Sequence, residues 1–253
     1  FTDAWVDPSI RLPVSLKSLK DRFHPDLSRN KVESFSKSLL LHEAAWKVSR
    51  LQTWDLIIRR NRWFQEKTIA RLEQLTREGK IVGDDITLFA FSYAAKELFS
   101  YAKQRGWKTV LDQIDPGLVE ENIVASLHEG NPDYRFDWKR APSEYWQDLK
   151  AEWDLADTVL VNSEWSKQCL HESGLHHPDI RILPLVYEKR SNSELTKRVY
   201  PDAFSSERRM RVLFLGQVLL RKGINLLLKA AKAMQDQPIQ FDIVGPEGVA
   251  IPD

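Results

Sequence analysis

Apolar positions along the chain follow two spacings, which predict helices in some stretches and strands in others. Helical spacing predicts a helix over residues 31–50 and a second over residues 57–78, which ends at Gly79. From residue 86 onward, short β-prone apolar runs alternate with helical stretches. The predicted strands cover residues 86–91, 107–111, 158–161 and 180–183, and the predicted helices cover residues 93–104, 115–128 and 142–156 and a stretch ending at Gly174.

Polar residues at the starts of two helices support these boundaries. Asp115 stands directly before Pro116, and Asp as N-cap with Pro in the first helical position is a favoured combination. Ser163 is the expected N-cap of the helix that follows the strand over residues 158–161. We therefore expect both helices to begin immediately after a strand.

Strands that alternate with helices of this length predict an α/β fold with a parallel sheet and crossover helices. The predicted strands are nearly all apolar, as parallel strands covered on both faces should be. Residues 185–209, rich in charge, predict an interdomain linker. The alternation then restarts, with a strand over residues 210–215, a helix over residues 224–234 and a strand over residues 239–244.

These patterns predict two domains, each of Rossmann-like type. Residues 1–184 are expected to form an N-terminal domain, and residues 210–253 the start of a second domain. A single strand–helix–strand unit cannot bury both faces of its own sheet. We therefore expect that more of the second domain follows Asp253 and that a leader precedes Phe1.

Composition and charge add expectations about the setting of the protein. Cys169 is the only cysteine and no Asn-x-Ser/Thr sequence occurs, which fits a reducing, cytoplasmic setting. The sequence contains no run of about 18 apolar residues, so no membrane span is predicted.

The net charge of +1 is unevenly distributed, with an excess of basic residues over residues 1–80. Within that stretch, the best candidates for peripheral contact with the inner face of a membrane are three basic residues beside an aromatic: Arg59, Arg60, Arg62 and Trp63. The alternative is that these residues belong to a solvated helix face.

The strongest local signal for chemistry is the sequence GQVLLRKG over residues 216–223. A predicted strand ends at Gly216, and a predicted helix begins near Gly223. Glycine allows close backbone approach, and helix N-termini present amides that suit phosphate. Arg221 and Lys222 lie where the helix dipole disfavours cations, so a bound anion would explain them. The loop therefore predicts a phosphate site, with a surface loop carrying two solvated cations as the alternative.

Three segments in this order resemble glycosyltransferase family 4: VLVNSEWSK over residues 159–167, IRILPL over residues 180–185 and the loop over residues 216–223. The sequence TVLDQIDPG over residues 109–117 and the pair Ala156-Asp157 are similar to the first domain of that family. The resemblance covers residues 86–253 well and residues 1–85 loosely.

The resemblance implies the GT-B architecture, in which two Rossmann-like domains flank a cleft. It implies transfer of a sugar from a nucleotide-sugar donor to a saccharide or lipid-linked acceptor, with retention of configuration and without a metal or other cofactor. Activity in cell-wall or polysaccharide biosynthesis would fit. Gly216, Gln217, Arg221 and Lys222 would bind the donor diphosphate. Lys222 matches the family's lysine, whereas Gln217 stands where an arginine is common.

The family also has, further along its second domain, a pair of glutamates separated by seven residues that hold the donor sugar and the ribose, and residues 210–253 contain no such pair. The resemblance likewise implies that residues 1–184 lack the first strand of their domain. We therefore expect this chain to be inactive by itself. The leading alternative is a non-catalytic Rossmann-like binding or scaffold module derived from such an enzyme. The sequence offers no evidence of a nucleic-acid partner.

Catalytic residues are less well marked than the phosphate loop. Ligands of open α/β folds bind at the carboxyl ends of strands, which makes Gln113 and Asp115 candidates, although Asp115 also fits a helix cap. Glu164 lies beside the Ser163 cap and is a third candidate. The spacing of His171, His176 and Cys169 fits no zinc motif, so no metal site is predicted, and Cys169 is expected to serve packing.

Overall fold

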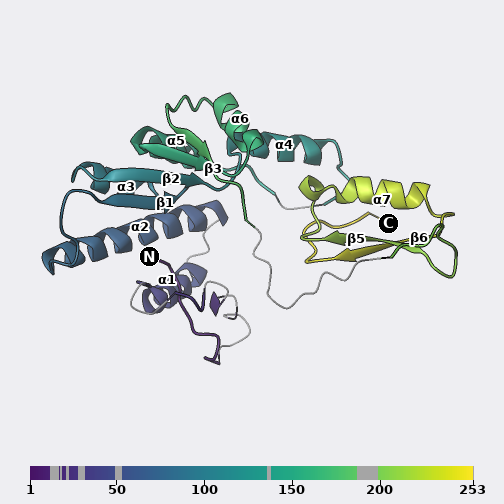
Figure 1. Cartoon of the computed structure of the whole chain (residues 1–253), viewed down its shortest axis with the longest axis horizontal. Helices are drawn as coiled ribbons and strands as arrows, with labels where there is room; N and C mark the ends of the chain where they lie inside the picture. The colour runs from purple at the N-terminus through teal and green to yellow at the C-terminus, as the bar shows by residue number, and fades with distance from the viewer. Residues whose placement is uncertain are drawn as a thin grey trace. The chain divides into compact units, whose positions relative to one another are not determined.

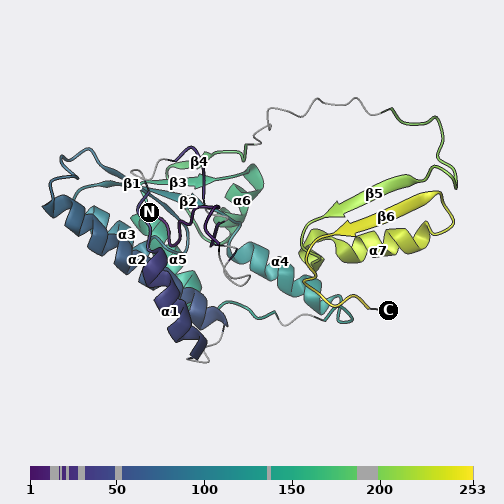
Figure 2. The same cartoon turned by 90° about the horizontal axis from the view of Figure 1, so that it is seen from below.

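A computed structural model describes residues 1–11, 17, 19–20, 23–27, 32–48, 53–135, 138–186 and 199–252. The chain forms two compact units, and the elements of each are drawn in Figures 1 and 2. The first unit comprises residues 1–114, 141–161 and 175–182, and the second comprises residues 115–140, 162–174 and 183–253. Residues 115–140 and 162–174 thus group with the second unit, although both lie within the expected first domain. The expected domain boundaries remain a prediction, and residues 187–198 of the expected linker lie outside the described residues.

The first unit contains a parallel four-stranded sheet of order β1-β2-β3-β4. Its strands are β1 (Thr87–Phe91), β2 (Lys108–Gln113), β3 (Thr158–Val161) and β4 (Ile180–Ile182). The register pairs Thr87 with Lys108, Val110 with Thr158 and Val159 with Ile180. The α/β fold and the parallel sheet that the sequence predicts are confirmed, and they are compatible with a Rossmann-like arrangement.

Helices of the first unit are α1 (Ser36–Val48), α2 (Thr53–Arg77), α3 (Lys96–Lys103) and α5 (Ser143–Leu155). The helix α3 packs against both α2 and α5 as well as against β1 and β2. The first residues of the chain pack on α1 and α2 through a core cluster that includes Ala4, Leu39 and Trp63. The expected helix over residues 93–104 begins three residues late, because residues 93–95 form a turn in which Tyr93 has a φ of 72°.

The second unit contains α4 (Leu118–Glu129), α6 (Glu164–Glu172), β5 (Met210–Leu215), the short 3₁₀ helix η3 (Leu220–Lys222), α7 (Ile224–Ala233) and β6 (Ile239–Val244). The strands β5 and β6 are parallel, with Met210 beside Ile239 and Leu215 beside Val244. The helix α7 covers one face of this pair (Figure 1), where Ile224, Leu227 and Phe214 share one core cluster. The predicted strand–helix–strand unit is therefore confirmed.

Two capping expectations have different outcomes. The Ser163 hydroxyl accepts a hydrogen bond from the Ser166 amide at 3.1 Å, which confirms Ser163 as the N-cap of α6. The expectation for Asp115 is wrong. The helix α4 has Gly117 as its N-cap, with a φ of 66°, and its first residue is Leu118. The Asp115 Oδ1 atom instead accepts a hydrogen bond from the Gly117 amide at 2.9 Å, which forms a turn before the helix.

No helix in the described part of the chain is long and apolar enough to cross a membrane.

The cap of α6 gives a test of local stability. Ser163→Ala should lower the free energy of unfolding by about 1 kcal/mol, because an amide of the first helical turn loses its acceptor. Urea denaturation followed by circular dichroism measures the change. Ser143→Ala is the matched control, because Ser143 is the first residue of α5 but makes no capping bond. Equal effects of the two substitutions would contradict the capping role.

Candidate functional site

The loops that follow β5 and β6 in the second unit continue the parallel pairing of these strands. The Gly216 amide donates to the Val244 carbonyl at 2.9 Å, and the Val218 amide donates to the Pro246 carbonyl at 2.9 Å. The Gly248 amide in turn donates to the Val218 carbonyl at 3.2 Å. The two loops therefore form one rim at the carboxyl ends of the strands, which is where open α/β folds bind ligands.

Glycines make this close approach of the two loops possible. Gly216 and Gly245 have φ values of 140° and 154°, which disfavour other residues. A Cβ atom on Gly245 would lie 1.8 Å from the Gly216 carbonyl oxygen, far inside van der Waals contact. A Cβ atom on Gly248 would lie 3.1 Å from Nε2 of Gln217, so the Gln217 side chain extends over the second loop. Gly216 and Gly248 are half-buried and Gly245 is exposed, so the two loops meet backbone to backbone at this rim.

The helix α7 begins at this rim. Gly223 is its N-cap, with a φ of 79°, and no side chain caps the helix. The buried Leu220 and Ile224 anchor η3 and the start of α7 in the core of the unit. Asn225 donates from Nδ2 to Oδ1 of Asn131 at 3.1 Å and so ties the first turn of α7 to the segment after α4. The start of the helix is thus held firmly, with its amides uncapped by any side chain.

The two cations beside this helix start have different partners. Arg221 Nη1 lies 3.3 Å from Glu120 Oε1 on α4, so a carboxylate of the same unit already neutralises this guanidinium. Lys222 is exposed and forms no ion pair with the residues that the structure describes. The expectation that both cations await an anion therefore needs correction for Arg221, and Lys222 is the cation left for a ligand.

The structure does not support a catalytic role for Gln113. Its side chain is fully buried in the first unit, and its Oε1 atom accepts a hydrogen bond from Nε1 of Trp153 at 3.0 Å. In this structure Gln113 holds α5 against β2, an environment that argues against contact with a substrate, and its catalytic role stays a prediction. The sequence suggested a ligand site only because Gln113 lies at a strand end.

Of the other two candidates, Asp115 is half-buried and Glu164 is exposed. Asp115 Oδ1 is engaged in the turn before α4. Glu164 is the first residue of α6, where a negative charge is favourable next to the helix N-terminus.

The basic cluster on α2 does not form the surface that a membrane contact needs. Trp63 is only 5% exposed and belongs to the core cluster, so it cannot act as an interfacial aromatic. Arg60 pairs with Asp3 at 2.7 Å, and Arg62 pairs with Glu144. Arg59 alone of the three arginines is exposed without an ion pair to the described residues. Of the expected membrane-contact surface, only Arg59 remains as an arginine without an ion pair to a described residue, because Arg60 and Arg62 are paired and Trp63 is buried.

Cys169 is 2% exposed, and burial raises the pKa of its thiol, which fits the expected packing role. Within the described ranges, no three or more His, Cys, Asp or Glu side chains lie together as metal ligands would.

Glu152 is a buried acid that the sequence pattern did not mark. Its side chain is 1% exposed, and its carboxylate caps the start of α3. Oε1 accepts hydrogen bonds from the amides of Ala95 and Lys96 at 2.8 and 3.2 Å, and Oε2 accepts one from Tyr93 at 2.8 Å. Only tertiary contact brings α5 to this point, because Glu152 lies 56 residues or more from each donor.

Burial raises the pKa of Glu152 to about 7, although the three amide hydrogen bonds favour its ionised form. The nearby Asp148 carboxylate raises the pKa further. In the unfolded chain the same group has an ordinary pKa of 4.5. The folded state therefore binds more protons than the unfolded state between these two values, and Glu152 contributes less stability as the pH rises from about 4.5 to about 7.

This linkage predicts the pH dependence of a variant. Glu152→Gln removes this titrating group. Between pH 5 and pH 8 the free energy of unfolding should therefore fall less in the variant than in the wild type, by up to roughly 3 kcal/mol. Urea denaturation of both proteins at several pH values measures this difference. Titratable groups that the two proteins share contribute equally to both profiles and cancel in the comparison. Parallel stability profiles for the two proteins would show that Glu152 stays ionised throughout.

The rim of the second unit, with its uncapped helix start and Lys222, is the best candidate site for an anionic ligand. No protein-family model matches this chain, and a search of curated proteins finds no match either.

Proposed function

We propose that the second unit binds the diphosphate of a nucleotide-sugar donor, as part of a glycosyltransferase with the GT-B architecture. The observation that carries the proposal is the combination at one rim of the glycine contact between Gly216 and Gly245, the uncapped start of α7 and the exposed Lys222. The order of the sequence segments that resemble glycosyltransferase family 4 supports the same function.

The physical argument is electrostatic. Amides at a helix N-terminus carry partial positive charge and bind phosphate well. The glycines lower the steric cost of bringing phosphate oxygens to the backbone. Lys222, the last residue of η3, adds a full positive charge directly before the N-cap of α7, where the dipole of α7 alone would disfavour it. A bound diphosphate would remove that conflict.

In the proposed reaction, the bond between the anomeric carbon and the diphosphate oxygen breaks while the acceptor oxygen bonds to that carbon. The proton of the acceptor hydroxyl passes to the departing phosphate. Negative charge grows on the diphosphate as it leaves, so Lys222 and the α7 amides would stabilise the transition state more than the ground state. Gln217, which extends over the second loop, would contact the diphosphate as a neutral donor.

A second candidate function is a non-catalytic binding or scaffold module of the same fold. The ion pair between Arg221 and Glu120 favours this second function, because Arg221 is one of the two cations expected at a donor site and already has a carboxylate partner. The burial of Gln113 also argues against one of the three candidates for catalysis. A module of this kind would bind nucleoside diphosphates weakly or not at all.

Calorimetric titration of the chain with UDP, GDP, ADP and inorganic pyrophosphate distinguishes the two functions. Lys222→Ala should weaken diphosphate binding by roughly 10- to 100-fold, because a charge-assisted hydrogen bond is lost. Lys229→Ala is the matched control, because Lys229 is exposed on α7, seven residues after Lys222. Equal binding by Lys222→Ala and the wild type would remove the site, and no binding by the wild type would favour the scaffold module.

The pair between Arg221 and Glu120 gives a prediction of opposite sign. Glu120→Gln should tighten diphosphate binding about two- to fivefold, because exposed ion pairs of this kind are worth up to about 1 kcal/mol and Arg221 would become available to the ligand. The same titration measures the change. Glu129→Gln on the same helix is the control, since Glu129 is exposed and forms no pair with Arg221. A decrease in affinity for Glu120→Gln would contradict this assignment.

A further inference from the structure

The turn between β1 and α3 is strained and lies between two fixed points of the backbone. Tyr93 is the one non-glycine residue in the described part of the chain with a positive φ, 72°. Bulky residues rarely adopt this conformation, and it persists only where surrounding contacts hold it. Before the turn, the Ser92 amide donates to the Asp112 carbonyl at 3.0 Å. After the turn, the Glu97 amide donates to Oε1 of the buried Gln65 at 2.8 Å. These two bonds confine a change of conformation to the residues between them.

The helix α5 holds Tyr93 at both its backbone and its ring. The Tyr93 amide donates to Oε2 of Glu152 at 2.8 Å. The Tyr93 ring stacks on the Tyr145 ring, with centroids 4.6 Å apart and planes inclined by 8°. Glu152 and Tyr145 both belong to α5, so the contacts that maintain the strained turn come from one helix.

The two carboxylate oxygens of Glu152 accept different numbers of hydrogen bonds. Oε1 accepts from the amides of Ala95 and Lys96, whereas Oε2 accepts from the amide of Tyr93. A protonated carboxyl keeps one carbonyl acceptor, and its other oxygen becomes a donor. A proton on Oε1 would break two amide bonds and a proton on Oε2 only one. The proton therefore goes to Oε2, and Tyr93 is the residue whose amide loses its acceptor.

A small polar cavity beside Glu152 gives the new O–H group a place to donate. The cavity has a volume of about 20 Å³, which is room for about one water molecule. Its walls include polar side chains from two helices, Asn61 and Gln65 on α2 and Asp148 on α5. A water held by these groups can accept from the protonated carboxyl, so that the proton is not left without a partner.

The charged groups around Glu152 pair with one another and leave its carboxylate without an ion pair to a described cation. Lys96 Nζ lies 2.7 Å from Asp148 Oδ1, and Arg62 pairs with Glu144. Uptake of a proton by Glu152 therefore breaks no salt bridge of its own. The titratable groups that line the small cavity with Glu152 come from α2, α3, α5 and the turn: Arg62, Tyr93, Lys96, Glu97, Tyr145 and Asp148.

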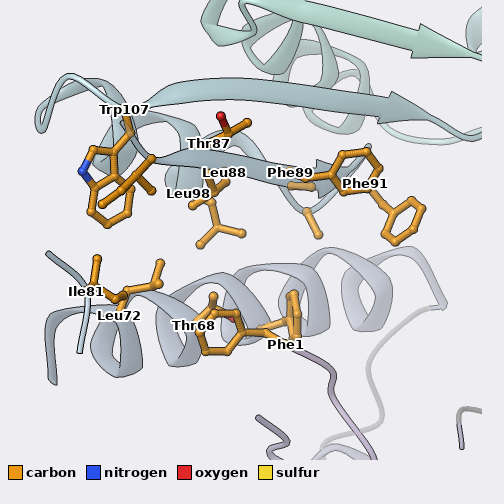
Figure 3. A pocket seen from close by; sticks show the side chains of 14 residues that line it. Phe1, Thr68, Leu72, Ile81, Thr87, Leu88, Phe89, Phe91, Leu98 and Trp107 are labelled. Atoms are coloured by element: carbon orange, nitrogen blue, oxygen red, sulfur yellow. The ribbon is translucent and has the colours of Figure 1, made fainter. Parts of the chain in front are cut away.

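The opposite side of the turn is apolar. Ala94 and Leu98 line a cavity between β1 and α2, into which the Leu98 side chain points (Figure 3). None of the described residues that line this cavity is charged. On β2, the side chain presented to α5 is the uncharged Gln113, bonded to Trp153. The ionisation of Glu152 therefore responds to the charges of the small polar cavity.

We propose that Glu152 and Tyr93 form a proton-operated switch at the carboxyl end of β1. The ionised carboxylate holds Tyr93 in the strained turn, with its ring on Tyr145. Proton uptake from solvent at Oε2 removes the acceptor of the Tyr93 amide, the φ of Tyr93 relaxes to a negative value, and the ring leaves Tyr145. Ala95 and Lys96 keep their bonds to Oε1, so α3 stays capped. Open α/β folds bind ligands at the carboxyl ends of their strands, so the switch changes the shape of such an edge.

Burial brings this switch into the neutral range, because it raises the pKa of Glu152 to about 7. The held turn is therefore the main form above about pH 7, and the released turn is the main form below it. The inference concerns the first unit alone, so it stands or falls separately from diphosphate binding.

NMR of the whole chain between pH 5.5 and pH 8.5 tests the switch. The amide protons of Tyr93, Ala95 and Lys96 should titrate with one common midpoint near pH 7. On acidification, the protection of the Tyr93 amide from hydrogen exchange, corrected for intrinsic exchange, should fall at least about tenfold, because a bond to a charged acceptor is lost. The Tyr93 NOE between its amide proton and its Hα, which is strong at positive φ, should weaken, and so should NOEs between the two stacked rings. The Ser92 amide, bonded to β2, should keep its protection.

Two variants assign the titration to Glu152. Glu152→Gln cannot ionise, so the midpoint should disappear and the Tyr93 amide should be poorly protected even at pH 8.5. Asp148→Asn removes the charge that disfavours ionisation of Glu152, so the midpoint should move to lower pH. If Glu152→Gln does not fold by circular dichroism, the shift in Asp148→Asn and the wild-type titration decide the question.

Three results would overturn the proposal. The first is constant amide shifts at residues 93–96 across this pH range. The second is a titration that persists unchanged in Glu152→Gln. The third is a titration of the amide shifts while the Tyr93 NOEs stay constant, because Glu152 would then take up its proton without releasing the turn.

Discussion

The contact between the backbones of Gly216 and Gly245 is the constraint on which the candidate site depends. Parallel strands end at the same edge of a sheet, so the loops after β5 and β6 must pass each other there. They do so at a distance that leaves no room for a side chain at Gly245. This contact aligns the hydrogen bonds between the two loops, which in turn position η3 and the start of α7. A larger residue at Gly245 would separate the loops, whereas a residue at Gly216 has open space and is disfavoured only by its φ of 140°.

Electrostatics in the second unit then decide what the rim can bind. The pair between Arg221 and Glu120 is 43% and 30% exposed, so water screens it and it is worth little. In the proposed site, a diphosphate would bring more than one negative charge and would accept hydrogen bonds from the amides of α7. It would therefore compete with Glu120 for the guanidinium at small cost, and the internal pair would lower its affinity without abolishing binding.

The starts of α3 in the first unit and of α7 in the second unit differ in whether a side chain accepts hydrogen bonds from their amides. In the first unit, the amides before and at the start of α3 are taken by the buried Glu152 carboxylate, so that position is closed to outside anions. In the second unit, no side chain caps α7.

The sequence by itself determined the α/β class, the positions of the strands, the Ser163 cap and the strand–loop–helix unit at Gly216, because these follow from local periodicity and from residues a few positions apart. It failed where contacts join distant segments. It placed Asp115 as a helix cap and Trp63 at the surface, and it did not show that Gln113 is buried or distinguish Glu152 from other helical glutamates. Burial and the partner Glu120 of Arg221 arise only when elements pack, since they depend on which faces meet in three dimensions.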